Sequence, residues 1–341
     1  MPQSQMSRIA ILGAGAWGTA LANLAARPGD RDGTEVMLWS RDPAHVDEMR
    51  ATGVNARRLP GIPLLSNVNP IAEPAQIEGT DLVLAAVPAQ ALRAVLEGFA
   101  SYLAKSVPVI VCAKGIERAT GLFMSQVAAS VLPNNPPAVL SGPSFAKEVA
   151  AGLPTAVTLA AQDGALAARL ARVLTSPAFR LYSSSDIRGA EIGGAAKNVL
   201  AIASGIAAGR GLGSSAAGAL IARGFAELSR FGRAYGAETA TLAGLSGLGD
   251  LVLTCTSAMS RNFSLGVELG RGISASEALA HGGLCEGAYT CGALLDLAHA
   301  KNIEMPIASA VDNVLAERIT IEESIAGLLA RPSKAELDIG G

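Results

Sequence analysis

The sequence predicts an α/β fold, in which a doubly wound sheet domain is followed by an all-helical C-terminal domain. A short apolar run near the N-terminus leads directly into a glycine-rich turn and a helix. Several continuous apolar runs of strand type follow, as expected for a sheet that is covered on both faces. Beyond about residue 185 the apolar spacing becomes helical. A length of 341 residues favours two domains, which we expect to span 1–185 and 186–341.

Composition excludes several classes of protein. Hydrophobic residues make up 50% of the chain and charged residues 16%, which indicates a well-buried globular protein. A formal net charge of −2 without a long basic run argues against nucleic acid as a partner. The N-terminal apolar run is too short for a signal peptide, and Val199–Ala208 is far shorter than a membrane span of roughly 20 residues. We therefore expect a cytoplasmic protein with no stable membrane insertion.

The cysteines and histidines indicate no metal site. The four cysteines form no CxxC pair, so reduced structural thiols are expected. The three histidines belong to no recognisable metal-binding motif.

The first motif is a dinucleotide-binding fingerprint. A strand over Arg8–Leu12 runs into the GxGxxG turn Gly13–Gly18, and a helix follows from Thr19. Gly13 permits the tight turn, Gly15 lets the backbone approach a pyrophosphate, and Gly18 lets the helix pack on the strand. The free N–H groups at the helix start favour the phosphates. This context predicts a Rossmann-type domain.

The end of the second predicted strand, Glu35–Trp39, bears on the choice of cofactor. An acidic residue there binds the ribose 2′-hydroxyl of NAD, whereas an arginine accommodates the 2′-phosphate of NADP. The chain continues with Arg41 and Asp42. Arg41 favours NADP and Asp42 leaves NAD open, and a plain exposed arginine is the alternative.

Polar residues follow two further apolar runs. Lys114 ends a strand at Pro108–Ala113, and the turn Ser141–Ala146 ends another. Ligands of such sheets bind beyond the carboxyl ends of the strands. We therefore expect Lys114 and Ser144 to lie near a nicotinamide, with Ser144 as a candidate helix cap. The remaining predicted strands are Asp81–Val87, Ala138–Leu140 and Ala156–Ala160, and Ser183–Asp186 is expected to be a polar hinge.

A long apolar helix over Gly189–Arg210 contains one lysine, Lys197. The residues on its face are all small, and the side chain lies over Gly193 and Gly194 because helical side chains point toward the N-terminus. Each glycine costs roughly 1 kcal/mol against alanine, so a reason is needed. Either another helix packs closely there, or a bare groove lets a ligand reach a desolvated lysine that acts as acid or base. A packed stem with a solvated head is the third possibility.

Two later segments could complete such a site. Gly244–Asp250 reads as a glycine-rich loop, and Asp250 could orient Lys197 and supply its counter-charge or simply cap a helix. Ser260 reads as a helix N-cap with Arg261 and Asn262 in the first turn. A guanidinium there is locally unfavourable unless an anion such as phosphate binds. Further helices are expected at Ala216–Tyr235, Thr290–His299 and Ile307–Glu317.

Six ordered motifs carry a family resemblance: GAGAWGTALA, VCAKGIE, SGPSFAKEVAAGLPTAV, GGAAKNVLAIASGI, GLGDLVLTCTS and SRNFSLG. Together they resemble the bacterial-type NAD(P)-dependent glycerol-3-phosphate dehydrogenases from about residue 8 to about residue 325. The resemblance implies reduction of dihydroxyacetone phosphate with NADP(H) or NAD(H), which supplies sn-glycerol 3-phosphate for phospholipid synthesis. It leaves a homodimer open.

The resemblance also implies roles for individual residues. The catalytic set comprises Lys197 as proton acceptor, with Lys114 and Asp250. Matches to substrate-contacting positions are Lys114, Gly142, Ser144, Lys197, Asp250, Ser260, Arg261 and Asn262. Matches to cofactor-contacting positions, besides the fingerprint glycines, are Ala16, Trp17, Arg41, Lys114, Ala146, Arg261, Leu284 and Glu286.

The sequence departs from the family pattern in two places, and two alternative functions stay open. The loop Pro28–Thr34 is longer than usual and puts cofactor preference in doubt, and the C-terminal Gly-Gly has no family counterpart. A related 3-hydroxyacid or ketopantoate-type reductase would need a carboxylate clamp in place of a phosphate site. A non-catalytic NADPH sensor would bind the cofactor without turnover, although a sensor needs no buried base.

Overall fold

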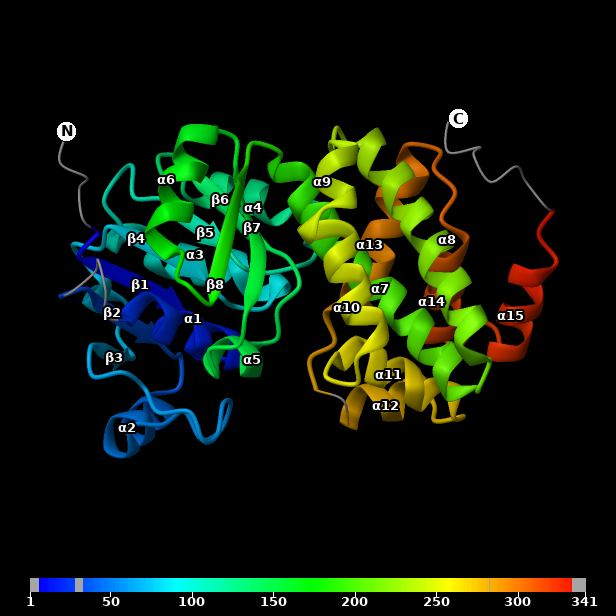
Figure 1. Cartoon of the computed structure of the whole chain (residues 1–341), viewed down its shortest axis with the longest axis horizontal. Helices are drawn as coiled ribbons and strands as arrows, with labels where there is room; N and C mark the ends of the chain where they lie inside the picture. Colours follow the sequence, from blue (N-terminus) through cyan, green and yellow to red (C-terminus); the bar gives the residue numbers. More distant parts are fainter. Residues whose placement is uncertain (1–5, 28–32, 282, 333–341) are drawn as a thin grey trace. The chain divides into compact units, whose positions relative to one another are not determined.

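The computed structural model describes residues 6–27, 33–281 and 283–332, and the chain divides into two compact units (Figure 1). The first unit comprises Met1–Ala113, Met124–Leu140 and Ser144–Ile187. The second comprises Lys114–Phe123, Ser141–Pro143 and Arg188–Gly341. Lys114 and Gly142 therefore belong to the second unit and Ser144 to the first.

An eight-stranded sheet forms the centre of the first unit, in the order β3-β2-β1-β4-β5-β6-β7-β8. The pairs β2–β3, β1–β2, β1–β4, β4–β5, β5–β6 and β7–β8 are parallel. The first six strands follow the order of doubly wound dinucleotide-binding sheets, which confirms the predicted fold class. The strands are β1 Arg8–Leu12, β2 Glu35–Trp39, β3 Val68–Ile71, β4 Leu82–Ala85, β5 Val109–Val111, β6 Pro137–Ser141, β7 Thr155–Ala161 and β8 Phe179–Ser184.

Helices cover this sheet, and its central strands are wholly buried. All four residues of β4 and all three of β5 are buried, which explains their continuous apolar sequences. Helices α1 and α5 contact each other, as do α3 and α4, whereas α6 packs on β7 and β8. The helices are α1 Ala16–Ala26, α2 Pro43–Thr52, α3 Leu92–Phe99, α4 Met124–Val131, α5 Ala146–Ala150 and α6 Gly164–Leu174, and short 3₁₀ turns span Pro74–Ile77, Ala89–Ala91 and Ala100–Tyr102.

Two local predictions for this unit are wrong, and two of its strands have no predicted counterpart. Strands β3 and β8 were not predicted, because both lie at the sheet edges and carry polar or proline residues that an edge tolerates. Ser183 and Ser184 belong to β8 and not to a hinge. Ser144 does not cap α5, since Phe145 occupies the N-cap position. Within the loop predicted at Pro28–Thr34, residues 28–32 lie outside the described residues, as does the C-terminal Gly-Gly.

The second unit is helical and is built around α7, Ile187–Gly209, which is almost entirely buried. At 23 residues α7 is long and apolar enough to cross a membrane by length and composition, contrary to the expectation from the shorter run Val199–Ala208. However, 83% of its most apolar window is buried within the fold, as in the core helix of a soluble protein. The other elements are α8 Gly213–Ala234, α9 Thr239–Ala243, a π-helical turn Leu245–Gly249, α10 Asp250–Thr256, α11 Arg261–Gly270, α12 Ala275–His281, α13 Glu286–Ala300, α14 Pro306–Leu315 and α15 Ile321–Leu329.

Glycines bring α7 and α11 into backbone contact. A Cβ atom on Gly205 would lie 2.1 Å from the carbonyl oxygen of Phe263, and one on Gly266 would lie 2.1 Å from that of Ile202. Gly209 and Gly270 repeat the arrangement one turn further along. Any larger side chain would force the helices apart, so the small residues of α7 serve close helix packing in this region.

Candidate active site

In the turn between β1 and α1, the fold requires glycine at two positions but not at a third. Gly13 has φ +114°, and a Cβ there would lie 2.7 Å from the carbonyl oxygen of Ala86. A Cβ on Gly18 would lie 1.9 Å from the carbonyl oxygen of Gly13. Gly15, the N-cap of α1, has φ −74° and open space around its Cβ position. This open surface beside the first N–H groups of α1 fits the close approach of a dinucleotide pyrophosphate.

Gly15→Ala and Gly18→Ala are therefore expected to fail in different ways. Gly15→Ala should keep wild-type stability but raise the KM for the dinucleotide about tenfold or more, because the methyl group occupies the ligand's side of the turn. Gly18→Ala should lower the free energy of unfolding by about 1–3 kcal/mol through overpacking. Urea unfolding and cofactor titration measure the two effects. A Gly15→Ala protein with unchanged cofactor KM would contradict this assignment.

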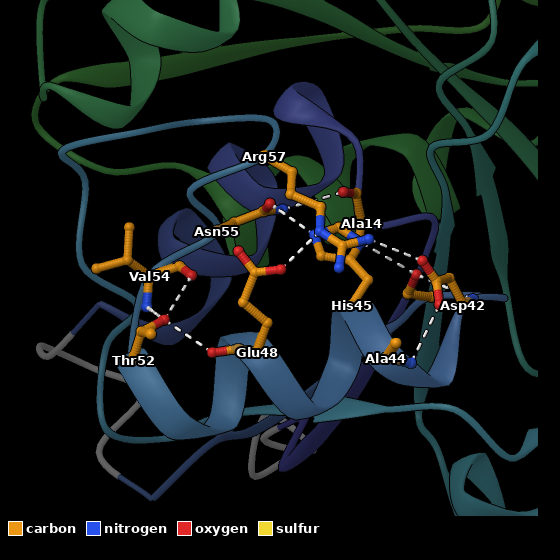
Figure 2. Close-up of polar contacts among 10 residues, drawn as sticks. Ala14, Asp42, Ala44, His45, Glu48, Thr52, Val54, Asn55 and Arg57 are labelled. Atoms are coloured by element: carbon orange, nitrogen blue, oxygen red, sulfur yellow. Dashed lines mark hydrogen bonds and ion pairs between the residues drawn. The ribbon is translucent and has the colours of Figure 1, made fainter.

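At the end of β2, Arg41 is exposed and Asp42 is already engaged. The Asp42 carboxylate accepts a hydrogen bond from Ala44 N at 3.0 Å, which caps α2, and forms an ion pair with Arg57 at 2.9 Å (Figure 2). Asp42 is thus the residue of the pair that already has partners within the chain.

The second unit brings three predicted catalytic residues together. The Asp250 carboxylate accepts a hydrogen bond from Lys197 Nζ on one oxygen and from Lys114 Nζ on the other, each at 2.6 Å. Lys197 also donates to Thr254 Oγ1 at 2.7 Å, and Lys114 to the carbonyl oxygen of Gly142 at 2.9 Å. Asp250 therefore orients both lysines, as predicted for Lys197.

The cluster is buried and positively charged overall. The Lys197 and Asp250 side chains are 9% and 1% exposed, and that of Lys114 is 18% exposed. Two ammonium groups and one carboxylate leave one net positive charge, which favours an anionic or polarised ligand. Burial lowers the pKa of Lys197 to about 8 against the opposing effect of Asp250, and Lys114 lowers it further. Lys197 can thus gain or lose a proton near neutral pH.

The predicted bare groove over Gly193 and Gly194 is wrong. A Cβ on Gly193 would lie 2.3 Å from the carbonyl oxygen of Ser246. One on Gly194 would lie 2.8 Å from Ser141 Oγ and 3.2 Å from Lys114 Cγ. The glycines therefore admit a neighbouring backbone and the stem of Lys114, and close packing is the correct interpretation. They leave no room for a substrate above the helix.

The predicted glycine-rich loop before Asp250 is also not a loop. Leu245–Gly249 forms a π-helical turn that leads straight into α10. A Cβ on Gly247 would lie 1.9 Å from the carbonyl oxygen of Leu242, so this tight winding requires glycine. The turn carries the Ser246 backbone onto α7 and sets Asp250 at the first position of α10. Asp250 therefore serves as the counter-charge and not as an N-cap.

The predicted phosphate site lies at the start of α11. Ser260 is the N-cap and accepts a hydrogen bond from Phe263 N at 3.2 Å, whereas Arg261 is exposed in the first turn. Asn262 is buried; its amide donates to Asn198 Oδ1 at 3.1 Å and accepts from Gly287 N at 2.9 Å. Asn262 therefore braces the start of α11 against α7 and α13.

Sequence reasoning missed Thr254 and Asn198. Thr254 stands one helical turn after Asp250 and holds the second hydrogen bond of Lys197. Asn198 follows Lys197 within the apolar helix, and its amide donates to the carbonyl oxygen of Lys114 at 3.3 Å. A buried amide in an otherwise apolar helix was the available signal, because buried polar groups need partners.

The remaining predicted cofactor residues are spread over both units. Ala16, Trp17 and Ala146 are partly buried in the first unit, and Leu284 and Glu286 in the second. Glu286 is the first residue of α13. The cysteines are free and buried. Within the described part of the chain, no group of three or more His, Cys, Asp or Glu residues could hold a metal ion.

Fold and site together define a two-unit, Rossmann-type dinucleotide-binding protein with a buried lysine–aspartate cluster. The models for the N- and C-terminal parts of NAD-dependent glycerol-3-phosphate dehydrogenase match residues 8–167 and 186–326. The chain therefore belongs to the NAD-dependent glycerol-3-phosphate dehydrogenase family.

Named proteins resemble the chain over nearly its whole length. An NAD(P)+ glycerol-3-phosphate dehydrogenase of Beijerinckia indica is 67% identical over 97% of this chain and 98% of its own. One of Azorhizobium caulinodans is 56% identical over 98% and 99%. The crystal structure of glycerol-3-phosphate dehydrogenase from Coxiella burnetii has a TM-score of 0.89 and 41% identity, covering 95% of this chain and 99% of its own.

Proposed function

We propose that the chain is an NAD(P)-dependent sn-glycerol-3-phosphate dehydrogenase that interconverts dihydroxyacetone phosphate and sn-glycerol 3-phosphate. The observation that carries this proposal is the Lys197–Asp250–Lys114 cluster in a chain whose two halves both match the family models. A nicotinamide cofactor supplies or accepts the hydride at C2 of the substrate.

Lys197 acts as the acid and base. Two of its three N–H bonds go to Asp250 and Thr254, so among the residues that the structure describes the third has no acceptor and can donate to the substrate carbonyl oxygen. As ammonium it gives that proton to the developing alkoxide during reduction, and as amine it removes the hydroxyl proton during oxidation. Lys114 adds a second positive charge that stabilises the oxyanion.

The phosphate of the substrate would bind at the start of α11. Arg261 offers a guanidinium, and the first turn of the helix offers N–H groups that favour a dianion. Ser144 and Gly142 would complete the substrate site, as the family resemblance implies. The Gly13–Gly18 turn, Ala16, Trp17, Arg41, Ala146, Leu284 and Glu286 would hold the cofactor.

The two parts of the chain would divide this work. Residues 1–185 would make most of the dinucleotide contacts, and residues 186–341 would supply Lys197 and most of the substrate site. The product would serve glycerophospholipid synthesis in the cytoplasm. The buried state of α7 supports a chain that works without entering a membrane.

A spectrophotometric assay with dihydroxyacetone phosphate, NADPH and NADH in parallel tests the proposal. We expect cofactor oxidation that depends on the phosphorylated substrate, and much weaker activity with unphosphorylated dihydroxyacetone. The ratio of kcat/KM for NADPH to that for NADH decides the cofactor preference, which exposed Arg41 predicts to favour NADPH.

The same assay separates the alternatives. Ketopantoate or a 3-hydroxyacid as the preferred substrate would indicate a carboxylate-binding reductase. NADPH binding without oxidation of the cofactor by any of these substrates would indicate a sensor. Either result would reject the proposed reaction.

A further inference from the structure

A buried hydrogen-bond relay connects the end of β2 to the glycine-rich turn, and no step of the proposed reaction uses it. Its members are Ser40, His45, Asn55 and Thr19, each less than 9% exposed. They come from the loop after β2, from α2, from the segment after α2 and from α1. Figure 2 shows the hydrogen bonds that join Asn55 to His45 and to Ala14.

The bond directions in this relay follow from the carbonyl oxygen of Ala14, which can only accept a hydrogen bond. Asn55 Nδ2 donates to this oxygen at 3.0 Å. Asn55 Oδ1 therefore faces His45 Nε2 at 2.8 Å, so that nitrogen carries the proton. In the neutral ring His45 Nδ1 then accepts from Ser40 Oγ at 3.3 Å, which itself accepts from Asp42 N at 3.3 Å.

The relay ends on two carbonyl groups of the glycine-rich turn. Besides Ala14, Asn55 Nδ2 donates to Thr19 Oγ1 at 2.7 Å. Thr19 Oγ1 in turn donates to the carbonyl oxygen of Gly15 at 2.9 Å. Because a trans peptide group is planar, its N–H points opposite to its C=O. Holding the carbonyls of Ala14 and Gly15 on the relay side therefore turns the N–H groups of Gly15 and Ala16 to the other side.

We infer that Asn55, with His45 and Thr19 behind it, is a positioning residue that aims the N–H donors of the glycine-rich turn at the pyrophosphate of the dinucleotide. The inference rests on the proposed function, because it requires a dinucleotide at this turn. The relay also fixes the loop that carries Arg41 to the same turn, through Ser40 and the backbone of Asp42. Preorganised donors bind an anion more tightly than donors that must be ordered on binding.

Asn55→Ala tests this role, with Asn23→Ala as the matched control. Asn23 is also a buried asparagine; it donates to the carbonyl oxygen of Pro63 at 2.8 Å and accepts from Leu65 N at 3.1 Å. It thus ties α1 to the segment after α2 without touching the glycine-rich turn. Both variants should unfold at lower urea concentration. Only Asn55→Ala should raise the Kd for NADPH, measured by fluorescence titration, about tenfold.

A hydroxyl swap keeps the test decisive if Asn55→Ala fails to fold. Thr19→Val preserves the side-chain shape without the hydroxyl, whereas Thr19→Ser keeps it. Thr19→Val should weaken NADPH binding several-fold, Thr19→Ser should restore it, and kcat should change by less than about twofold in both, since binding and not chemistry is affected.

The outcomes distinguish this inference from the proposed function. Equal Kd values for Asn55→Ala and Asn23→Ala, or for the two Thr19 variants, would overturn the positioning role alone. Wild-type protein that binds NADPH without reducing dihydroxyacetone phosphate would reject the proposed reaction and leave the binding comparison intact. Wild-type protein that binds neither NADPH nor NADH would overturn both.

Discussion

Lys197→Met is expected to lower kcat for the reduction of dihydroxyacetone phosphate by about 10²-fold or more, the usual contribution of a positioned acid. Methionine keeps much of the apolar stem but cannot donate a proton. It also leaves the Asp250 carboxylate paired with Lys114 alone, so the free energy of unfolding must be measured beside the rate. The KM for the dinucleotide should change little, because the cofactor turn is built from other residues.

The pH dependence of the wild-type reaction rates should reflect the ionisation of Lys197. With a pKa of about 8, Lys197 is protonated below that pH and neutral above it. The reduction rate should therefore fall as the pH rises through about 8, whereas the oxidation rate should rise over the same range. Both changes of rate with pH should be absent from the residual activity of Lys197→Met.

Lys301→Met is the matched control, because Lys301 is an exposed lysine at the end of α13. Its activity and pH profile should equal those of the wild type. If Lys197→Met kept activity within tenfold of the wild type, Lys197 would not be the acid, and a water molecule or Lys114 would have to supply the proton.

The central sheet and the dinucleotide turn could be predicted because their signals are local. Strands buried on both faces read as continuous apolar runs, and the spacing of Gly13, Gly15 and Gly18 follows directly from the turn that they form. The edge strands β3 and β8 lack that signal, since an edge admits polar residues and a proline. The other strands could be predicted because burial on both faces makes their sequences continuously apolar, and not because of the β-propensity of their residues.

The Lys197–Asp250–Lys114 cluster could be predicted only in part because its geometry depends on contacts distant in sequence. Lys197 and Asp250 are 53 residues apart, and their pairing could be suggested only from the need of a buried ammonium for a counter-charge. The same glycines could line a groove or admit a backbone, and only the position of Ser246 decides between the two. The π-helical turn that places Asp250 requires Gly247, but a glycine-rich segment is equally compatible with a loop.

Asp250→Asn is expected to damage both stability and activity. Asparagine keeps the shape and one acceptor oxygen but removes the negative charge shared by Lys197 and Lys114. Breaking a buried ion pair by removing one partner costs about 3–5 kcal/mol, because an uncompensated charge is left behind. Part of that cost should be relieved by the loss of a proton from Lys197, so its pKa should fall below about 8 and the reduction rate should decline at lower pH than in the wild type.

Urea unfolding and the pH profile of kcat together test this expectation, with Asp296→Asn, an exposed carboxylate on α13, as the control. The direction of the pH shift tests whether Asp250 stabilises the ammonium form of Lys197. A merely structural aspartate would change stability and leave the profile where it was. A shift to higher pH would contradict the counter-charge role, because removing a carboxylate that stabilises the ammonium lowers the pKa of Lys197.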